Sequence, residues 1–230
     1  MALRPVFIEA IRDEKLLNKV DVEFKWHPGF SVKQKQKSIK SLHGNFLKKD
    51  SYKEFNILEV STKSNEALGV ALSAFNLQFE VNEKVANVEA AFQSSKVFKE
   101  GGPYKDLLYK GAREVKGDDR LKNSGDLIGF EFNDRNWPLE PKTLFYDWVY
   151  INALLQNNKY IKKLEKYNGF TDIEFNPKKS INCQAKSLAL FSTLKKRGLI
   201  NKVFKSSEAY IEFIKEFNSD EEMKQLDFFG

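Results

Sequence analysis

The segment Val88–Phe98, VEAAFQSSKVF, brings an acid, an amide and a base together at helical spacing. If the segment is one helix, Glu89, Gln93 and Lys96 fall within an arc of roughly 60° at ~100° per residue. Apolar side chains cover most of the remaining circumference, which is typical of a buried helix. Buried charged groups need a partner or a function. Two interpretations follow, a reactive stripe that lines a site or an ordinary amphipathic helix whose polar residues reach solvent at the protein edge.

Glu89 and Lys96 are residue types that can carry covalent or acid–base chemistry. Seven residues of helix would separate their backbones by ~10.5 Å, which leaves room for a small substrate group between the two side chains. A lysine in a poorly solvated pocket has a lowered pKa and can attack a carbonyl or imine carbon. A carboxylate in the same pocket can act as an acid, a base or a stabiliser of a cation. The pair alone does not define a substrate.

Two further segments contain residue types that suit a ligand site. Leu72–Asn76, LSAFN, is either a loop pressed against a ligand or a buried strand end. Ala112–Leu121 offers Arg113 and Arg120, whose planar guanidinium groups can clamp a diphosphate. A charged surface turn is the alternative for this second segment.

Two later segments place acids in unusual surroundings. Asp147 lies among four aromatic residues in FYDWVY, where it is either hydrogen-bonded structure or a ligand of sugar hydroxyls. Asp172 and Asn182 flank a loop that contains a proline and ends where a helix is expected to start. Such a loop is either an anion site or a plain capped loop.

The composition predicts a globular protein. Of the 230 residues, 41% are hydrophobic and 20 are Phe, which is enough for an aromatic-rich core. Cys183 is the only cysteine, so no internal disulfide can form, and one Cys with two His gives no cluster of zinc-ligand spacing. No apolar run approaches the ~18 residues of a membrane span, and the N-terminus has no long apolar signal region. We therefore expect a soluble, cytoplasmic protein without a metal, a cofactor or a membrane partner.

Positive charge is concentrated near the N-terminus. Thirty-eight basic and 32 acidic residues give a net charge of +6, and residues 24–49 contain seven lysines and no acid. The aromatic residues interleaved with these lysines are Trp26, Phe30 and Phe46. Lysines beside aromatic rings can neutralise phosphates and stack bases, which makes Lys33, Lys35 and Lys37 candidates for DNA binding. A lysine-rich solvated loop is the alternative.

Hydrophobic periodicity predicts a predominantly helical α+β fold with a few strands toward the N-terminus. Asn87 is the expected N-cap of the helix that carries Glu89, and Thr143 that of a helix through LFYDWVYINALL. No glycine-rich nucleotide loop is present. We expect a single domain over residues 1–230. Its parts are a strand- and loop-rich region, a pocket-forming helical core and C-terminal helices, at residues 1–70, 71–200 and 201–230.

These residues resemble the NADAR family, the YbiA-like fold whose members act on ADP-ribose-type and related N-glycosides. The family's Ser-x-Phe run is matched by Ser73-Ala74-Phe75, and its Glu, Phe-Gln and Lys helix by Glu89, Phe92-Gln93 and Lys96. Its basic and acidic turn corresponds to residues 113–120, and its late Asp and Asn to Asp172 and Asn182. The phrases VEAAFQSSKVF, GGPY, WPLEPKTLFYDWVYINAL and TDIEFNPKKSINCQA are similar to the branch of NADAR proteins encoded beside DarT toxins. The similarity covers nearly the whole chain.

The resemblance implies a specific activity. DarT-type toxins are ADP-ribosyltransferases that modify DNA bases, so this branch is expected to act as an antitoxin that removes ADP-ribose from guanine. The implied partners are ADP-ribosylated DNA and the cognate DarT-type toxin, and the implied catalytic residues are Lys96 and Glu89. The expected ADP-ribose-binding residues are Ser73, Phe75, Asn76, Gln93, Arg113, Arg120, Asp147, Trp148, Asp172 and Asn182. Among them the arginines would hold the diphosphate and the two aspartates the ribose hydroxyls.

Two mechanisms and two other functions remain open. Lys96 either forms a Schiff base with the sugar, or stands beside it while Glu89 stabilises an oxocarbenium-like transition state. The alternatives to DNA repair are an N-glycosidase for a free nucleotide or metabolite and a non-catalytic antitoxin that binds its toxin or shields DNA. Ala74, Ala90 and Glu174-Phe175 differ from the YbiA pattern, which argues against a riboflavin-intermediate substrate.

Overall fold

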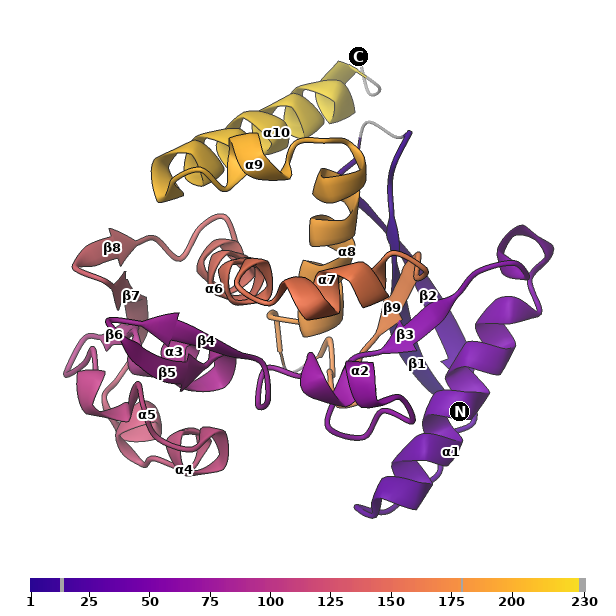
Figure 1. The fold of residues 1–230 in the computed structure, drawn as a ribbon, viewed down its shortest axis with the longest axis horizontal. Helices are drawn as coiled ribbons and strands as arrows, with labels where there is room; N and C mark the ends of the chain where they lie inside the picture. Colours follow the sequence, from indigo (N-terminus) through magenta and orange to yellow (C-terminus); the bar gives the residue numbers. More distant parts are fainter. Residues whose placement is uncertain (13–14, 179, 228–230) are drawn as a thin grey trace.

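The computed structural model describes residues 1–12, 15–178 and 180–227. Within them a four-stranded sheet, a three-stranded sheet and a two-stranded hairpin are packed among helices, which confirms the α+β class (Figure 1). The last three residues of the predicted C-terminal helical part, 228–230, lie outside the described residues, as does Lys179 in the late loop.

The four-stranded sheet joins both halves of the chain. Its order is β2-β1-β9-β3, with β1 (Ala2–Glu9) antiparallel to β2 (Leu17–Phe24) and to β9 (Gly169–Thr171). β3 (Ile57–Glu59) runs parallel to β9. The ends of two parallel neighbours meet at one edge of a sheet. The residues that follow Glu59 and Thr171 therefore lie side by side.

Helix α1 (Val32–Leu47) fills the lysine-rich segment, which the sequence suggested to be a strand- and loop-rich region. Ser31 caps it by accepting a hydrogen bond from the Gln34 amide at 3.3 Å. Its apolar stripe of Ile39, Leu42 and Phe46 is buried against one face of the sheet. Lys33, Lys37 and Lys40 are exposed, whereas Lys35 is mostly buried. The expected loop is thus wrong, because the apolar stripe recurs at helical spacing between the lysines.

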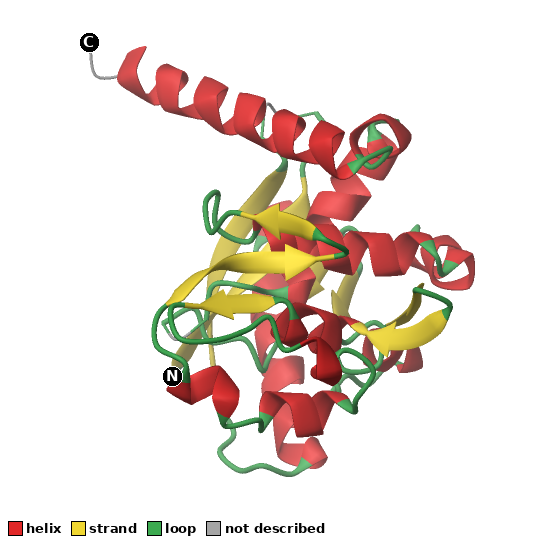
Figure 2. Ribbon diagram, turned by 90° about the vertical axis from the view of Figure 1, so that its left-hand side faces the viewer, coloured by secondary structure: helices red, strands yellow, loops and turns green. Residues whose placement is uncertain are grey.

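The other face of the sheet contacts the main helical core. α8 (Gln184–Lys196) packs between the sheet and α6 (Leu144–Leu155), and α7 (Asn158–Leu164) packs on α6. α9 (Ile200–Val203) and α10 (Ser207–Asp227) complete this layer, and Figure 2 shows α10 along one edge of the molecule. No helix in the described part of the chain has the length and apolar character needed to cross a membrane.

The middle of the chain forms a second lobe of short elements, on the left of Figure 1. A hairpin feeds the helix that carries Glu89, and a three-stranded sheet of order β6-β7-β8 follows. α2 (Ala67–Ala71) lies beside β3 and leads into this lobe (Figure 1). The strands and α-helices of the lobe are β4 (Gln78–Val81), β5 (Lys84–Asn87), α3 (Val88–Ser94), β6 (Lys96–Phe98), α4 (Ala112–Lys116), α5 (Arg120–Asn123), β7 (Leu127–Phe132) and β8 (Arg135–Trp137). Two 3₁₀ turns, η1 (Asp50–Tyr52) and η2 (Lys105–Leu107), complete the connections. Strands therefore extend well beyond the N-terminal part in which we expected them.

The segment Val88–Phe98 is not one helix. Asn87 caps α3 as expected, by accepting the Ala90 amide at 2.8 Å. The hydroxyl groups of Ser94 and Ser95 both donate to the Ala91 carbonyl, at 3.2 and 2.6 Å, and the helix ends there. Serine hydroxyls compete with backbone amides for such carbonyls. Lys96 consequently begins β6 and pairs with Phe130 of β7.

Candidate active site

A cavity of about 460 Å³ opens where β3 and β9 end and α3 begins. Its lining comes from residues 61–63 after β3, residues 73–75, α3 with Lys96, α4, and residues 172–184. This volume falls within the ~300–1,000 Å³ typical of small-molecule sites. Of the predicted site residues, it brings together Ser73, Phe75, Glu89, Gln93, Lys96, Arg113, Asp172 and Asn182.

Glu89 is held in a defined position at the start of α3. Its side chain is buried, and its backbone amide donates to the Ala74 carbonyl at 3.0 Å, which ties α3 to the loop that carries Ser73 and Phe75. Gln93, one turn later, donates from Nε2 to Glu89 Oε1 at 3.0 Å. The amide therefore orients the carboxylate, as the spacing of four residues predicts.

Lys96 reaches the same cavity from a strand. Its Nζ lies 5.2 Å from the centre of the Phe92 ring. Burial lowers the pKa of Lys96, the Glu89 carboxylate partly opposes this shift, and the nearby Lys116 adds to it. A lowered pKa increases the share of neutral amine, which is the nucleophilic form.

Gly102 fixes the backbone of Lys96. It has a φ of +81°, and a Cβ at this position would overlap the carbonyl oxygen of Lys96. Only glycine combines this backbone conformation with such a close approach. The GGPY phrase thus has a packing role beside the lysine.

Asp172 lies at the end of β9, opposite α3. Its Oδ1 accepts the amides of Glu174 and Phe175 at 3.0 and 3.2 Å. Burial raises the pKa of Asp172 well above its usual range, and the adjacent Glu59 carboxylate adds to the rise. A protonated or weakly charged acid beside a ligand suits hydrogen bonding to hydroxyl groups.

Glu59 is the centre of a buried network behind Asp172. Its Oε1 accepts the Ser61 hydroxyl at 2.6 Å and the Ile173 amide at 2.9 Å, and its Oε2 accepts the Thr171 hydroxyl at 2.7 Å. Burial raises the pKa of Glu59. The network ties the end of β3 to the end of β9, so Ser61 and Asp172 are placed in the cavity by one carboxylate.

His43 on α1 extends this network. Its Nε2 lies 2.7 Å from the Thr171 hydroxyl, and because that hydroxyl donates to Glu59, the imidazole is the donor. Burial lowers the pKa of His43 to about 4, so the ring is neutral near pH 7. Helix α1 is thus bonded directly to the strand that carries Asp172.

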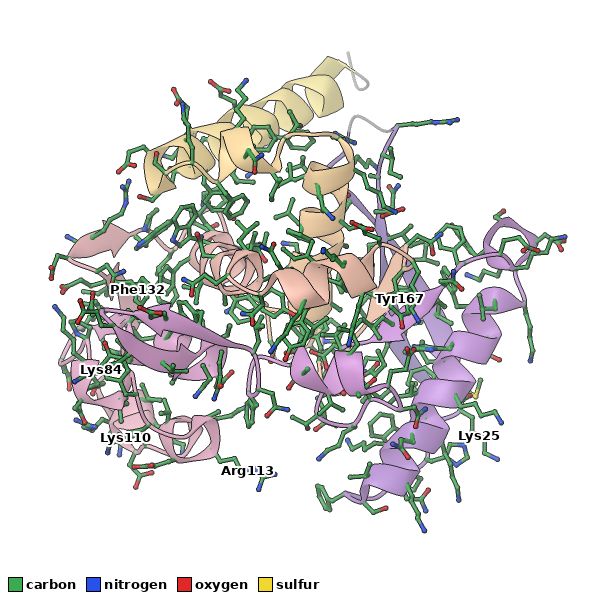
Figure 3. The ribbon with its side chains drawn as sticks, in the orientation of Figure 1. Lys25, Lys84, Lys110, Arg113, Phe132 and Tyr167 are labelled. Carbon is green, nitrogen blue, oxygen red and sulfur yellow. The ribbon has the colours of Figure 1, made fainter. Side chains whose placement is uncertain are left out.

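Besides Lys96, three basic side chains line the cavity without an acidic partner among the described residues. They are Lys63, Arg113 and Lys116. Lys116 Nζ lies 5.3 Å from the centre of the Phe75 ring, and Figure 3 shows Arg113 pointing away from α4 at the lower edge of the molecule. Free cations beside a buried carboxylate and lysine form a site suited to an anionic ligand.

Arg120, the other predicted diphosphate ligand, is not in the cavity. Its guanidinium donates to both oxygens of Asp106, at 3.2 and 2.8 Å, and to Asp118 at 2.9 and 3.0 Å. This pairing lowers the pKa of Asp118 to about 2. The part of the segment around Arg120 is the charged surface turn that the sequence left open, because Asp118 and Asp106 use the donors of this arginine, whereas Arg113 lines the cavity.

Asp147 and Trp148 also lie outside this cavity. Asp147 accepts the hydroxyls of Thr143 and Ser187, at 2.6 and 2.5 Å, and so joins α6 to α8. The Trp148 ring stacks on Phe204 with centres 5.4 Å apart and contacts the terminal helices. Of the two interpretations of FYDWVY, the geometry matches hydrogen-bonded structure.

Asn76 and the three predicted DNA-binding lysines of α1 lie outside the cavity. Asn76 donates to the Val70 carbonyl at 2.9 Å and closes the turn before β4. Lys35 forms an ion pair with Glu174 at 2.9 Å, while Lys33 and Lys37 are exposed on α1. None of these side chains lines the cavity.

Several lining residues carried little signal in the sequence. Gln184 accepts the Ala74 amide at 2.6 Å and donates to the Val60 carbonyl, so it joins two walls of the cavity. Lys116 is three residues after Arg113 on one helix, and this spacing could have indicated it. Glu59, behind the cavity wall, is a buried acid at the end of β3, and a fully buried acid is uncommon. Lys63, Ser61 and Tyr146 had no pattern that marks a site.

The fold and the site together define an α+β protein with a cavity built around an oriented carboxylate, a poorly solvated lysine and unpaired cations. The chain belongs to the DarT1-associated NADAR antitoxin family, whose model matches residues 2–224. The resemblance seen in the sequence is thereby confirmed. A comparison with curated proteins gave no match.

Proposed function

We propose that this antitoxin is an ADP-ribosyl glycohydrolase that removes ADP-ribose from guanine bases in DNA and so reverses the action of a DarT-type toxin. The proposal rests on one observation. Glu89, from a helix, and Lys96, from a strand, line the same cavity, together with cations that have no acidic partner among the described residues. The family supplies the association with the toxin. The chemistry of the cavity supports the substrate.

The diphosphate and the ribose of ADP-ribose have complementary groups in the cavity. Arg113, with Lys63 and Lys116, offers charge to the diphosphate, and the guanidinium can bind two phosphate oxygens at once. Asp172 and Asn182 offer hydrogen bonds to ribose hydroxyls. Ser73 and Phe75 form the wall next to Glu89.

Lys96 is the proposed nucleophile. In ADP-ribosyl-guanine the exocyclic amine is bonded to the anomeric carbon, and ring opening gives an imine at that carbon. The neutral Lys96 amine adds to this carbon, guanine leaves as the free amine with a proton from Glu89, and a lysine Schiff base remains. Water then hydrolyses the Schiff base, which releases ADP-ribose and the lysine.

A carboxylate mechanism is the alternative for the same site. Glu89 would stabilise an oxocarbenium-like transition state and activate water, as glycosidase carboxylates do, with Lys96 as a hydrogen-bonding group. Reduction with borohydride during turnover separates the two. A lysine–sugar adduct on the wild type and none on Lys96→Arg supports the Schiff base, whereas no adduct and an active Lys96→Arg exclude it.

The substrate is tested with oligonucleotides ADP-ribosylated on guanine or on thymine. We expect release of ADP-ribose from guanine only, and a loss of at least about 100-fold in Glu89→Gln and Lys96→Met, in line with the loss of an acid–base group. Lys99→Ala is the matched control, because Lys99 is exposed and pairs with Asp126 at 2.7 Å. Turnover of free ADP-ribosyl-guanosine but not of DNA would instead assign a nucleotide glycosidase, and inhibition of the toxin without turnover would assign a binding antitoxin.

A further inference from the structure

Phe30 is the one aromatic residue of the lysine-rich segment that is fully available to a partner. Phe46 is buried in the core and stacks on Tyr52, with ring centres 4.6 Å apart. Trp26 is partly buried and is covered by Lys35 and Arg4, whose cationic groups lie 4.6 and 5.7 Å from its ring. Phe30, in contrast, is 97% exposed. A phenylalanine this exposed has no role in packing the fold.

Phe30 lies at the start of the helix that contacts the cavity wall. It directly precedes Ser31, the N-cap of α1. Lys35, in the first turn of the same helix, forms its ion pair with Glu174, which lines the cavity. The start of α1 and α4, which carries Arg113, both lie along the lower edge of the molecule (Figures 1 and 3). The exposed ring and the cationic wall therefore belong to one edge.

The positive charge of the segment around Phe30 favours a polyanionic partner. Residues 24–49 contain seven lysines and no acid. Lys33 and Lys37 have no ion pair with any described residue, and neither do Arg113 and Lys116 of the cavity wall. Cations that follow a phosphate backbone, combined with an aromatic ring that can stack on a base, are the pattern of single-strand binding sites. In a duplex the base faces are stacked on one another and not open to such a ring.

We infer that Phe30 stacks on an unpaired nucleobase beside the modified guanine, and that Lys33 and Lys37 bind the adjoining phosphates. The substrate is then a single-stranded DNA segment that crosses the start of α1 with its ADP-ribosyl group in the cavity. This inference rests on the proposed function for the position of the modified base. It extends that function by assigning the strand form and a contact outside the cavity.

Binding is tested first, with a fluorescein-labelled unmodified single-stranded oligonucleotide and fluorescence anisotropy at low salt. Phe30→Ala should weaken binding at least about fivefold, the lower end of the effect of removing one stacked aromatic residue. Phe30→Trp should bind as well as the wild type or more tightly, because it restores a stacking ring. The control is Val85→Ala, which removes another exposed apolar side chain, 60% exposed on β5.

Turnover gives the second readout, on two substrates with the same linkage. Phe30→Ala should lower kcat/KM at least about fivefold for a single-stranded ADP-ribosylated oligonucleotide, and leave kcat/KM for ADP-ribosyl-guanosine unchanged. Equal losses on both substrates, or unchanged binding of the oligonucleotide, overturn the inference. So does a Phe30→Ala variant that binds DNA normally but no longer binds the toxin, since the ring would then be a protein contact.

The two proposals fail in different ways. If wild-type protein releases ADP-ribose from neither substrate, the proposed function fails while the binding assay still decides the role of Phe30. If the wild type releases ADP-ribose and Phe30→Ala behaves like the wild type on both substrates, only the stacking contact fails. Melting curves for each variant serve as the control for unfolding. Because Phe30 buries almost no surface, we expect Phe30→Ala to melt at the wild-type Tm.

Discussion

Burial decides what Lys96 can do. The Phe92 ring and the walls of the cavity exclude water from its amine, which lowers its pKa, and the charge of Lys116 lowers it further. Glu89 acts in the opposite direction but forms no ion pair with the amine among the described residues. Burial thus increases the share of neutral amine, while Lys96 still lines the cavity.

Removing the charge of Lys116 should shift the pH dependence of turnover. With Lys116→Gln, the pKa of Lys96 rises, so the ascending limb of kcat moves to higher pH at saturating substrate. The pH profile of kcat measures this, with Lys99→Gln as a control that keeps the wild-type limb. If the ascending limb of the profile is unchanged in Lys116→Gln, that limb does not report the deprotonation of Lys96.

Lys96 should also reduce the stability of the fold. Its pKa is lower in the folded than in the unfolded state, so the unfolded chain binds more protons between the two values and stability rises with pH there. Below that window the folded state bears the full penalty. Lys96→Met should therefore raise Tm at pH 7 while abolishing turnover, which thermal melting monitored by circular dichroism detects. A lower Tm would contradict the poorly solvated position of the amine.

Asp147 joins α6 to α8 through hydrogen bonds to two hydroxyl groups, outside the cavity. Asp147→Ala leaves the hydroxyls of Thr143 and Ser187 without their buried acceptor, which we expect to cost about 1–3 kcal/mol of unfolding free energy. The rate of ADP-ribose release should be unchanged in the folded variant. Urea denaturation and kcat measure the two effects, with the exposed Asp126→Ala as control. A loss of kcat at full stability would return Asp147 to the sugar site.

At the scale of elements, α2 lies so close to β3 that only glycine fits between them. A Cβ on Gly69 would overlap the carbonyl oxygen of Glu59 and the side chain of Ser64. Gly69→Ala should destabilise the fold by about 1–3 kcal/mol, the usual range for overpacking. Gly44, inside α1, has no neighbour within 4 Å of an added Cβ, so Gly44→Ala should stabilise the fold by about 0.5–1 kcal/mol. Urea denaturation of the pair tests both signs.

The contact of α1 with β9 should make stability fall in acid. The pKa of His43 is about 4 in the folded state and near 6.5 otherwise, so the unfolded chain binds more protons between these values. Folding stability is lost as pH falls through this window, by no more than roughly 3 kcal/mol from this residue. In His43→Gln the loss between pH 6.5 and pH 4 should be smaller. Equal losses in both proteins would assign the acid sensitivity to other groups.

The exposed lysines of α1 should determine part of the salt dependence of DNA binding by the protein. Replacing both Lys33 and Lys37 by Gln removes two phosphate contacts and should reduce the slope of log K against log salt by about 1.4 for a single strand. The matched control is Lys162→Gln with Lys163→Gln, two exposed lysines on α7. Anisotropy titrations at several salt concentrations give both slopes. Equal slopes would show that α1 is no part of the DNA path.

The sequence predicted those features that depend on neighbours along the chain. Periodicity indicated α6, and the Asn87 cap indicated the start of α3. Thr143 directly precedes α6 but makes no side-chain capping hydrogen bond, because its hydroxyl donates to Asp147. The spacing of Glu89 and Gln93 placed them on one helix face, where they are hydrogen-bonded. It missed the strand at Lys96, because two serine hydroxyls end the helix and the partner strand β7 is distant in sequence. It also missed Glu59, whose partners at residues 171 and 173 meet it only after β9 joins the sheet.

Because β9 is far from β3 in the sequence, the cavity is completed only when most of the chain has been synthesised. One wall of the cavity follows β3 near residue 60, and the opposite wall follows β9, more than 100 residues later. A growing chain on the ribosome carries Glu89 and Lys96 well before it carries Asp172, Asn182 and Gln184. Unfinished or proteolytically clipped chains that lack this last segment therefore cannot complete the cavity. Under the proposed function, only chains translated past α8 can remove ADP-ribose, so protection would follow the number of full-length molecules.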